Sequence, residues 1–308
     1  MIRKTLNLFL AIGAAATVGI GAAAASGGGT APLKHEHWSF AGPFGTYDKE
    51  AMQRGYQVYE TICSNCHGVS LLAFRNLGEK GGPFHLDACP AGIPETVDCS
   101  IANNNPIVKA IAANYKFKVT DGPDDTGGMF DRAPIPSDRI PSPYANEQQA
   151  RAANGGARPP DLSLIIKARH HGPDYVYSLL TGFEEAPPNF NLAPTQHYNP
   201  YFPGDMSQLL KEEFRTPEGH PIEGIEIPHG GVLAMAPPLA DGVVDYADES
   251  VPETVEQYSH DVVQFLAWAS EPKMEARKKL GFMTIAYLLV LTGILYWSYR
   301  EIWSKVEH

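Results

Sequence analysis

The chain has 308 residues and a formal net charge of −11. Residues 1–25 carry +2 and residues 277–308 carry +3, so residues 26–276 carry −16. A body with this charge repels nucleic acid, which argues against nucleic-acid binding, and it attracts basic proteins. The 26 prolines and 29 glycines predict a modest helical core wrapped in long ordered loops.

Residues 1–25 have the organisation of an export signal. Two basic residues near the start are followed by an apolar run over residues 6–20 and by small residues at 23–25. We therefore expect residues 1–25 to be a signal peptide and the mature chain to begin near Ser26. An uncleaved anchor helix is the alternative.

A helix is predicted over residues 48–62, with Asp48 as its N-cap, and it leads into the sequence Cys63-Ser-Asn-Cys66-His67. Two thiols separated by two residues and followed by histidine form the attachment signature of c-type haem. The sulfurs reach the porphyrin vinyl groups, and the imidazole lies over the iron. A zinc site and a thioredoxin-like pair are the alternatives. Zinc normally needs a second close cysteine pair, so we predict one covalent haem c.

The two other cysteines, Cys89 and Cys99, lie in a predicted loop over residues 78–100. In an exported protein we expect such a pair to form a disulfide, with free thiols as the alternative. Further along we predict a helix that begins at Pro106, because proline suits a first helical position. An acidic, proline-rich loop over 118–143 and a short helix over 146–153 follow.

Two helices are predicted on either side of Gly172, over residues 165–171 and 174–181. Arg169 and Tyr175 lie on the two elements that meet at this break. A guanidinium pairs with a carboxylate through two parallel hydrogen bonds, so Arg169 and Tyr175 are candidates for holding the haem propionates. A surface ion pair is the alternative for Arg169.

The iron needs a second axial ligand from a distant segment of the chain. Of the seven methionines, only Met129, Met206 and Met235 lie outside the terminal segments and the predicted helices. Met235 is followed by Ala-Pro-Pro, and prolines would hold its sulfur in a rigid extended strap. We therefore predict His67 and Met235 as the metal ligands, a pair that raises the reduction potential. The alternative second ligands are His197 and His229.

The C-terminal part predicts two helices. Residues 254–270, at the end of an acidic stretch over 241–256, carry an apolar face that we expect to cross the helix before the haem motif. Residues 280–299 carry no formal charge and can span about 30 Å as a helix. We expect a transmembrane anchor over 277–299 and a cytoplasmic tail over 300–308. By the positive-inside rule, the basic residues before the span outweigh those after it and would place the body in the cytoplasm. The export signal and the haem motif instead predict a body outside the cytoplasm.

Short motifs follow one another along the chain: Cys63-Ser-Asn-Cys-His-Gly68, Arg158-Pro-Pro-Asp-Leu-Ser163, Arg169-His170, Asp174-Tyr-Val176, Asn199-Pro-Tyr-Phe-Pro-Gly204, Met235-Ala-Pro-Pro238 and Phe265-Leu-Ala-Trp-Ala-Ser-Glu-Pro272. This ordered set resembles the cytochrome c1 family, the haem-bearing subunits of ubiquinol–cytochrome c oxidoreductase (the bc1 complex). The resemblance implies a mainly α, class I cytochrome c-like domain over residues 26–276, with long loop excursions and a C-terminal transmembrane helix. It implies that Cys63, Cys66, His67, Met235, Arg169 and Tyr175 bind the haem.

The resemblance also implies an electron route from a Rieske iron–sulfur protein through this haem to a soluble or tethered cytochrome c. Cytochrome b would oxidise the quinol, and the complex would be dimeric. The export signal is of bacterial type, so we expect the haem domain at the periplasmic face of the inner membrane, with the anchor in membrane lipid. A stand-alone membrane-anchored electron carrier or haem sensor is the alternative. The chain departs from mitochondrial relatives in a partly helical insertion over residues 205–231.

Overall fold

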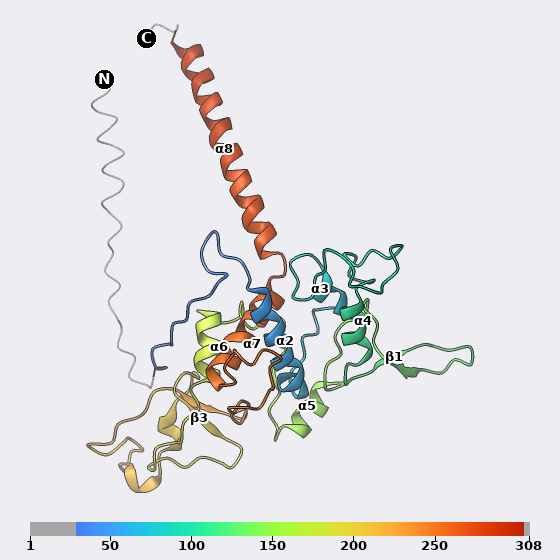
Figure 1. Cartoon of the computed structure of the whole chain (residues 1–308). Helices are drawn as coiled ribbons and strands as arrows, with labels where there is room; N and C mark the ends of the chain where they lie inside the picture. Colours follow the sequence, from blue (N-terminus) through green and yellow to red (C-terminus); the bar gives the residue numbers. More distant parts are fainter. Residues whose placement is uncertain (1–28, 305–308) are drawn as a thin grey trace.

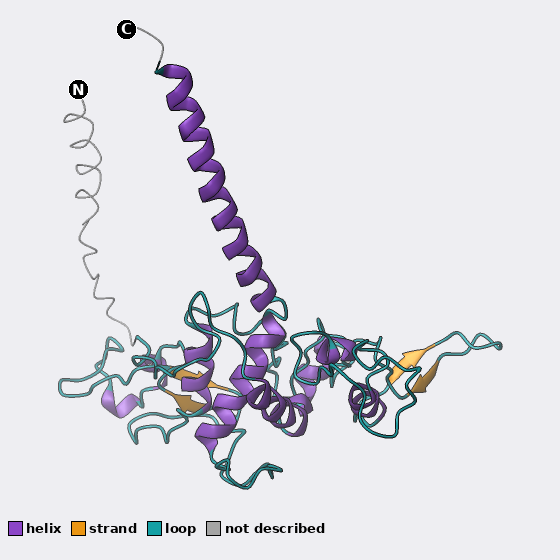
Figure 2. Cartoon of the chain, turned by 45° about the horizontal axis from the view of Figure 1, so that its top comes forward, coloured by secondary structure: helices purple, strands orange, loops and turns teal. Residues whose placement is uncertain are grey.

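The computed structural model describes residues 29–304, so the expected signal peptide and the last residues of the expected tail lie outside the described residues. The fold is mainly α, with long loops and two small sheets (Figure 2). The helices are α2 (Lys49–Thr61), α3 (Phe74–Gly78), α4 (Pro106–Ala113), α5 (Glu147–Ala153), α6 (Gly172–Leu180), α7 (Val255–Ser270) and α8 (Met274–Trp303). The strands are β1 (Val119–Asp121), β2 (Phe130–Arg132), β3 (His197–Asn199) and β4 (Gly231–Leu233).

Helices α2 and α7 cross at the centre of the core, as predicted (Figure 1). The Asp48 side chain caps α2 by accepting a hydrogen bond from the Ala51 amide at 3.1 Å. Gly55 allows the helices to approach closely, because a Cβ there would lie 1.9 Å from the Asp261 carbonyl oxygen. The aromatic ring of Phe265 on α7 then contacts the ring of Tyr59, with centroids 5.5 Å apart. This crossing fixes the end of α2, where the haem motif begins.

A buried ion pair joins the same two helices. The Asp261 side chain is fully buried, and it accepts hydrogen bonds from Arg54 Nε at 2.8 Å and Nη2 at 2.9 Å. The Tyr246 hydroxyl donates a third, at 2.9 Å. Burial alone would raise the pKa of Asp261, but His260 and Arg54 outweigh it and hold that pKa below its usual range. The paired carboxylate therefore ties α2, α7 and the 241–256 stretch together.

Two of the predicted elements differ from the structure. Residues 165–171 form turns instead of a helix, because the chain folds back until a Cβ on Gly172 would lie 1.7 Å from the Ile166 carbonyl oxygen. Within the predicted loop over 118–143, β1 and β2 pair as an antiparallel hairpin. Arg132 holds its base by hydrogen bonds to Asp121 and Asp138.

A second antiparallel pair positions the segment that contains Met235. Strand β3 pairs with β4 in a register that places His197 opposite Leu233, two residues before Met235. The insertion over 205–231 leaves and returns at this pair (Figure 1). It contains short 3-10 turns, Met206–Leu209 and Glu212–Phe214, in agreement with the prediction that it is partly helical. Met206 and Leu210 of the insertion share a small core with Phe190 and with Tyr198 of β3.

Cys89 and Cys99 form the predicted disulfide. Helix α8 projects away from the body, with no other described helix beside it (Figure 1). Among residues 29–304 it is the one helix long and apolar enough to cross a membrane, and its most apolar stretch is not buried against the rest of the protein.

The close α2–α7 approach predicts the effect of a single methyl group. In Gly55→Ala, the new Cβ collides with α7, and we expect the free energy of unfolding of the holoprotein to fall by about 2 kcal/mol, as in other overpacked cores. Denaturant unfolding followed by far-ultraviolet circular dichroism measures the change. The control is Thr61→Ala at an exposed position of α2, with an expected change within about 0.5 kcal/mol. Equal stabilities for the two variants would contradict the close approach.

Candidate haem-binding site

A cavity of about 500 Å³ opens beside the end of α2. This volume is within the usual range for small-molecule and cofactor sites. Most of its wall is apolar and comes from α6, α7 and the segments around residues 157–165 and 233–238. All six residues singled out in the sequence line this one cavity: Cys63, Cys66, His67, Arg169, Tyr175 and Met235.

The two thiols lie on the tight turn that follows α2. The amides of Cys66 and His67 both donate to the Cys63 carbonyl oxygen, at 3.1 and 2.8 Å, so the three side chains are presented by one compact turn. Neither sulfur is in a disulfide. Burial, with a smaller contribution from nearby Cys66, raises the pKa of Cys63 to about 12. This thiol is therefore protonated at neutral pH, and adding its S–H across a vinyl group would form a thioether with no leaving group.

The imidazole of His67 is oriented by a hydrogen bond to Pro160. The Nδ1–O distance to the Pro160 carbonyl is 2.8 Å, and a carbonyl can only accept, so Nδ1 carries the proton. Nε2 is then the nitrogen with a free lone pair. Burial lowers the pKa of His67 and outweighs the hydrogen bond to Pro160, which raises it. A neutral imidazole with an unprotonated Nε2 is the form that binds iron.

Asp161 fastens the segment of Pro160 to the segment of His67. Its carboxylate accepts hydrogen bonds from the amides of Ser70 and Ser163, both at 2.9 Å. The Leu162 amide also donates to the Gly68 carbonyl oxygen at 2.8 Å. Burial alone would raise the pKa of Asp161, but its hydrogen bonds with Ser163 and Ser70 hold that pKa below its usual range. This role of Asp161 was not predicted from the sequence, although the residue lies in the Arg158–Ser163 motif.

Of the five candidates for the second ligand, three methionines and two histidines, only Met235 lines the cavity. Met129 is 63% exposed and lies just before β2. Met206 is fully buried in the core of the insertion. The ring of His229 is held elsewhere, with Nδ1 2.8 Å from the Gly29 carbonyl oxygen.

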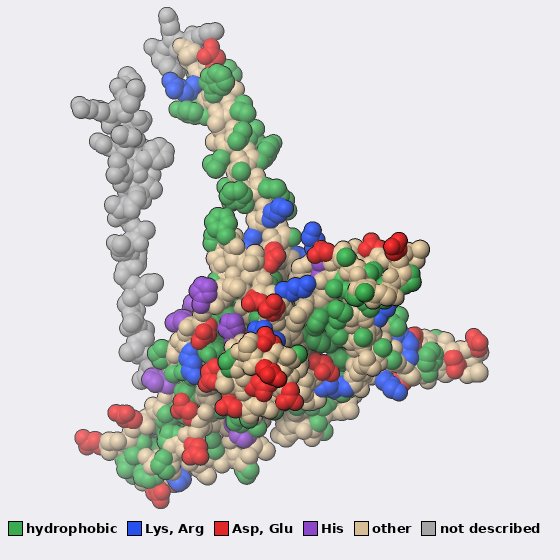
Figure 3. Space-filling view, in the orientation of Figure 1, with side chains coloured by type: hydrophobic (Ala, Val, Ile, Leu, Met, Phe, Trp, Pro, Cys, Tyr) green, Lys and Arg blue, Asp and Glu red, His purple; other side chains and the backbone are tan. Residues whose placement is uncertain are grey.

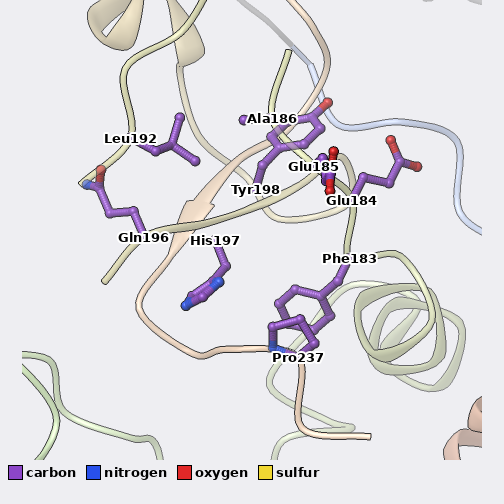
Figure 4. A pocket seen from close by; sticks show the side chains of 9 residues that line it. All are labelled: Phe183, Glu184, Glu185, Ala186, Leu192, Gln196, His197, Tyr198 and Pro237. Carbon is purple, nitrogen blue, oxygen red and sulfur yellow. The ribbon is translucent and has the colours of Figure 1, made fainter. Parts of the chain in front are cut away.

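His197 lines a different pocket, of about 420 Å³. Figure 4 shows Phe183 and Pro237 side by side in this pocket, and Pro237 also lines the larger cavity. The strap after Met235 therefore lies between the two spaces. A ligand from His197 would have to cross this strap to enter the cavity.

Arg169 and Tyr175 both line the cavity, from the turn and the helix that meet at Gly172. Burial raises the pKa of Tyr175, and the charge of Arg169 partly offsets this increase. The Arg169 side chain is exposed and donates to the Ala168 carbonyl oxygen at 3.2 Å. In the described part of the chain no carboxylate forms an ion pair with Arg169, so the surface ion pair weighed above is not found there.

These residues fit a covalent haem. Paired thiols and a neutral imidazole come from one turn, a thioether comes from a distant strap, and an apolar wall surrounds them. A mainly helical fold built around such a cavity is that of a c-type cytochrome.

Residues 38–306 match the Cytochrome C1 family, so the chain belongs to this family. It is 43% identical over 286 residues to "Cytochrome b/c1" of Bradyrhizobium diazoefficiens, which covers 87% of the chain but only 35% of that longer protein. It is 36% identical to cytochrome c1 of Rhodospirillum rubrum, over 96% of the chain and 97% of the relative. It is 41% identical to a mitochondrial cytochrome c1 of Arabidopsis thaliana, over 88% of the chain and 72% of the relative.

The comparisons confirm the family, the fold class and the cofactor expected from the sequence motifs. The cofactor is a covalently attached haem c, and the protein is a c-type cytochrome of electron transfer, of the kind found as a subunit of ubiquinol–cytochrome c oxidoreductase.

The hydrogen bonds of Asp161 predict a pH-dependent contribution to stability. Because its folded pKa is lowered, the contribution is present above the unfolded pKa of about 3.9 and is lost as the pH falls through the folded value. At pH 7 we expect Asp161→Asn to reduce the free energy of unfolding by about 1 kcal/mol, since the carboxylate is partly exposed. The difference from wild type should shrink below about pH 4.

Denaturant titrations of the holoprotein at a series of pH values measure this difference. Asp125→Asn, at an exposed turn position, is the matched control and should show no such pH dependence. A difference between Asp161→Asn and wild type that stays constant down to pH 2 would contradict the assignment.

Proposed function

We propose that this chain carries electrons from a Rieske iron–sulfur protein to a soluble or tethered cytochrome c within the bc1 complex. Cys63 and Cys66 would hold the haem covalently, and His67 and Met235 would bind its iron. One observation carries the proposal: a thioether and an imidazole separated by more than half of the chain line the same apolar cavity.

The bound haem supplies reversible one-electron chemistry, and the protein residues supply its environment. His67 offers Nε2 to the iron because Nδ1 is hydrogen-bonded to the Pro160 carbonyl oxygen. Val262 and Leu266 on α7 help to keep the cavity dry. Arg169 and Tyr175 would bind the propionates, the guanidinium by paired hydrogen bonds. A dry pocket with a thioether ligand favours the reduced iron and a high potential.

The proposed arrangement in the membrane follows the domain boundaries expected above. Residues 26–276 form the periplasmic haem domain after removal of 1–25, residues 277–299 span the bacterial inner membrane, and residues 300–308 are cytoplasmic. The unburied apolar length of α8 supports the span. A partnership with cytochrome b is supported by the relative whose printed name joins cytochromes b and c1 in one longer protein.

The acidic stretch over 241–256 supports docking of a basic cytochrome c. It carries six acids and no Lys or Arg, and most of these acids are exposed. The stretch begins three residues after Pro238, which lines the cavity. Figure 3 shows Asp and Glu side chains gathered on one face of the body. Such a surface speeds the encounter with a lysine-rich partner and makes it sensitive to salt.

Replacing the second axial ligand tests the site. In Met235→Leu, we expect the haem to stay attached through Cys63 and Cys66, while the potential falls by a sizeable part of the roughly 0.8 V range that axial ligands control. Spectroelectrochemical titration of the holoprotein measures the potential. Met129→Leu is the control and should leave it unchanged. An unchanged potential in Met235→Leu would assign the ligand to another residue.

Charge neutralisation tests the docking surface. We expect a variant with Asp245→Asn, Glu249→Gln and Glu256→Gln to reduce cytochrome c at least tenfold more slowly at low salt, the lower end of the range for electrostatic steering. The difference from wild type should vanish at high ionic strength. The control neutralises Glu218, Glu223 and Glu226 on the insertion, with the same change in total charge. Equal rates for both triple variants, or a rate independent of salt, would contradict this docking surface.

A further inference from the structure

A loop before α2 carries an exposed aromatic side chain to the base of α8. Phe44, in the loop over 39–46, is 80% exposed, although most large apolar side chains of the body are buried or partly buried. Its ring contacts the ring of Phe282 on α8, with centroids 6.3 Å apart. Figure 1 shows this blue loop rising beside the first turns of α8, on the side of the body from which the helix leaves.

Hydrogen bonds fix this loop to α8. Lys278 Nζ on the helix donates to the carbonyl oxygens of Phe40 and Gly45, at 2.7 and 2.9 Å. Directly after the loop, the Tyr47 amide donates to Glu275 Oε1 on α8 at 2.8 Å, and the Tyr47 hydroxyl donates to the carbonyl oxygen of Glu271, the C-cap of α7, at 3.1 Å. The loop and the start of α8 therefore form one unit.

The loop is also closed internally. The Thr46 amide donates to the Ser39 carbonyl oxygen at 3.0 Å, and the Ala41 amide donates to the Trp38 carbonyl oxygen at 2.9 Å. A Cβ on Gly45 would lie 2.1 Å from the Ala41 carbonyl oxygen, so the chain is tightly folded there. The position of Phe44 relative to α8 is thus set by backbone contacts.

The contact with Phe282 defines the level of Phe44 along α8. Phe282 is the third residue of the uncharged run over 280–299, and three basic residues at 277–279 come just before this run. Figure 3 shows Lys and Arg side chains around the base of α8 and hydrophobic side chains beyond it. Basic residues beside aromatic residues are typical of the boundary between lipid headgroups and hydrocarbon.

We propose that the loop over 39–46 is a second membrane contact of the haem domain and that Phe44 inserts into the phospholipid bilayer beside Phe282. The inference rests on the proposed membrane span of α8. An exposed aromatic ring continuous with the apolar surface of this helix is buried by lipid at the same depth, and the basic residues at 277–279 lie near anionic headgroups. The loop and α8 together would then hold the haem domain at a fixed tilt above the membrane.

Spin labels test the depth of the loop. We would place a nitroxide on Phe44→Cys in the full-length holoprotein, reconstituted in nanodiscs of phosphatidylcholine and phosphatidylglycerol. Collisions with oxygen, which concentrates in lipid, are compared with collisions with a water-soluble nickel chelate. Phe282→Cys on α8 is the control for lipid, and Phe130→Cys on β2, 45% exposed, is the control for water.

We expect the ratio of oxygen to nickel accessibility at position 44 to exceed that at position 130 several-fold and to approach that at position 282. A ratio at 44 equal to that at 130 would overturn the proposal. A label at 44 that is shielded from both reagents would also overturn it, because a protein would then cover Phe44. If position 282 itself is as accessible to nickel as position 130, the membrane span of α8 fails as well. If the label at position 282 is exposed to lipid and the label at position 44 is exposed to water, the loop contact is overturned and the membrane span of α8 still stands.

Discussion

The hydrogen bond from His67 to the Pro160 carbonyl oxygen is the constraint on which the site depends. It joins residues 93 positions apart, at 2.8 Å, and decides which ring nitrogen is left for iron. The bond exists because Asp161 and Leu162 tie the second segment to residues 68–70. The protein fold therefore orients the imidazole of His67 by itself, without a contribution from iron.

The segment that carries Met235 is fixed by different contacts. Met235 comes from a strap between the short strand β4 and two prolines. Strand β4 is fixed by its pairing with β3 and by the packing of Val232 against the small core. The insertion over 205–231 packs Met206 and Leu210 against Tyr198 of β3, in a small core beside this pairing. Helix α7 contributes part of the apolar wall and is itself fixed by the crossing with α2 at Gly55. A rigid, dry site is the environment that electron transfer through a haem requires.

Local signals in the sequence predicted the helices well. Asp48, Asn105, Asn146 and Thr254 each cap a helix close to its expected start. The haem motif and the Met-Ala-Pro-Pro strap also identified residues that line one cavity. Spacing could not predict the turns over 165–171, since they depend on the contact between Gly172 and Ile166.

Other features depend on tertiary contacts that no local pattern encodes. The pairing of β3 with β4 joins segments on both sides of a long insertion, and each strand has three residues. The role of Asp161 depends on the amide of Ser70, which is 91 positions away in the sequence. The apposition of Phe44 and Phe282 joins residues more than two hundred positions apart. In each case the residues are visible in the sequence, but their contacts are determined by the tertiary fold.

The identity of the two axial ligands is the centre of this account, and near-infrared magnetic circular dichroism of the oxidised holoprotein measures it directly. The charge-transfer band of low-spin ferric haem has different positions for imidazole–thioether and bis-imidazole ligation. We predict the imidazole–thioether position in the wild-type protein at neutral pH. A band at the bis-imidazole position, or a high-spin spectrum with an open iron site, would contradict the assignment of His67 and Met235.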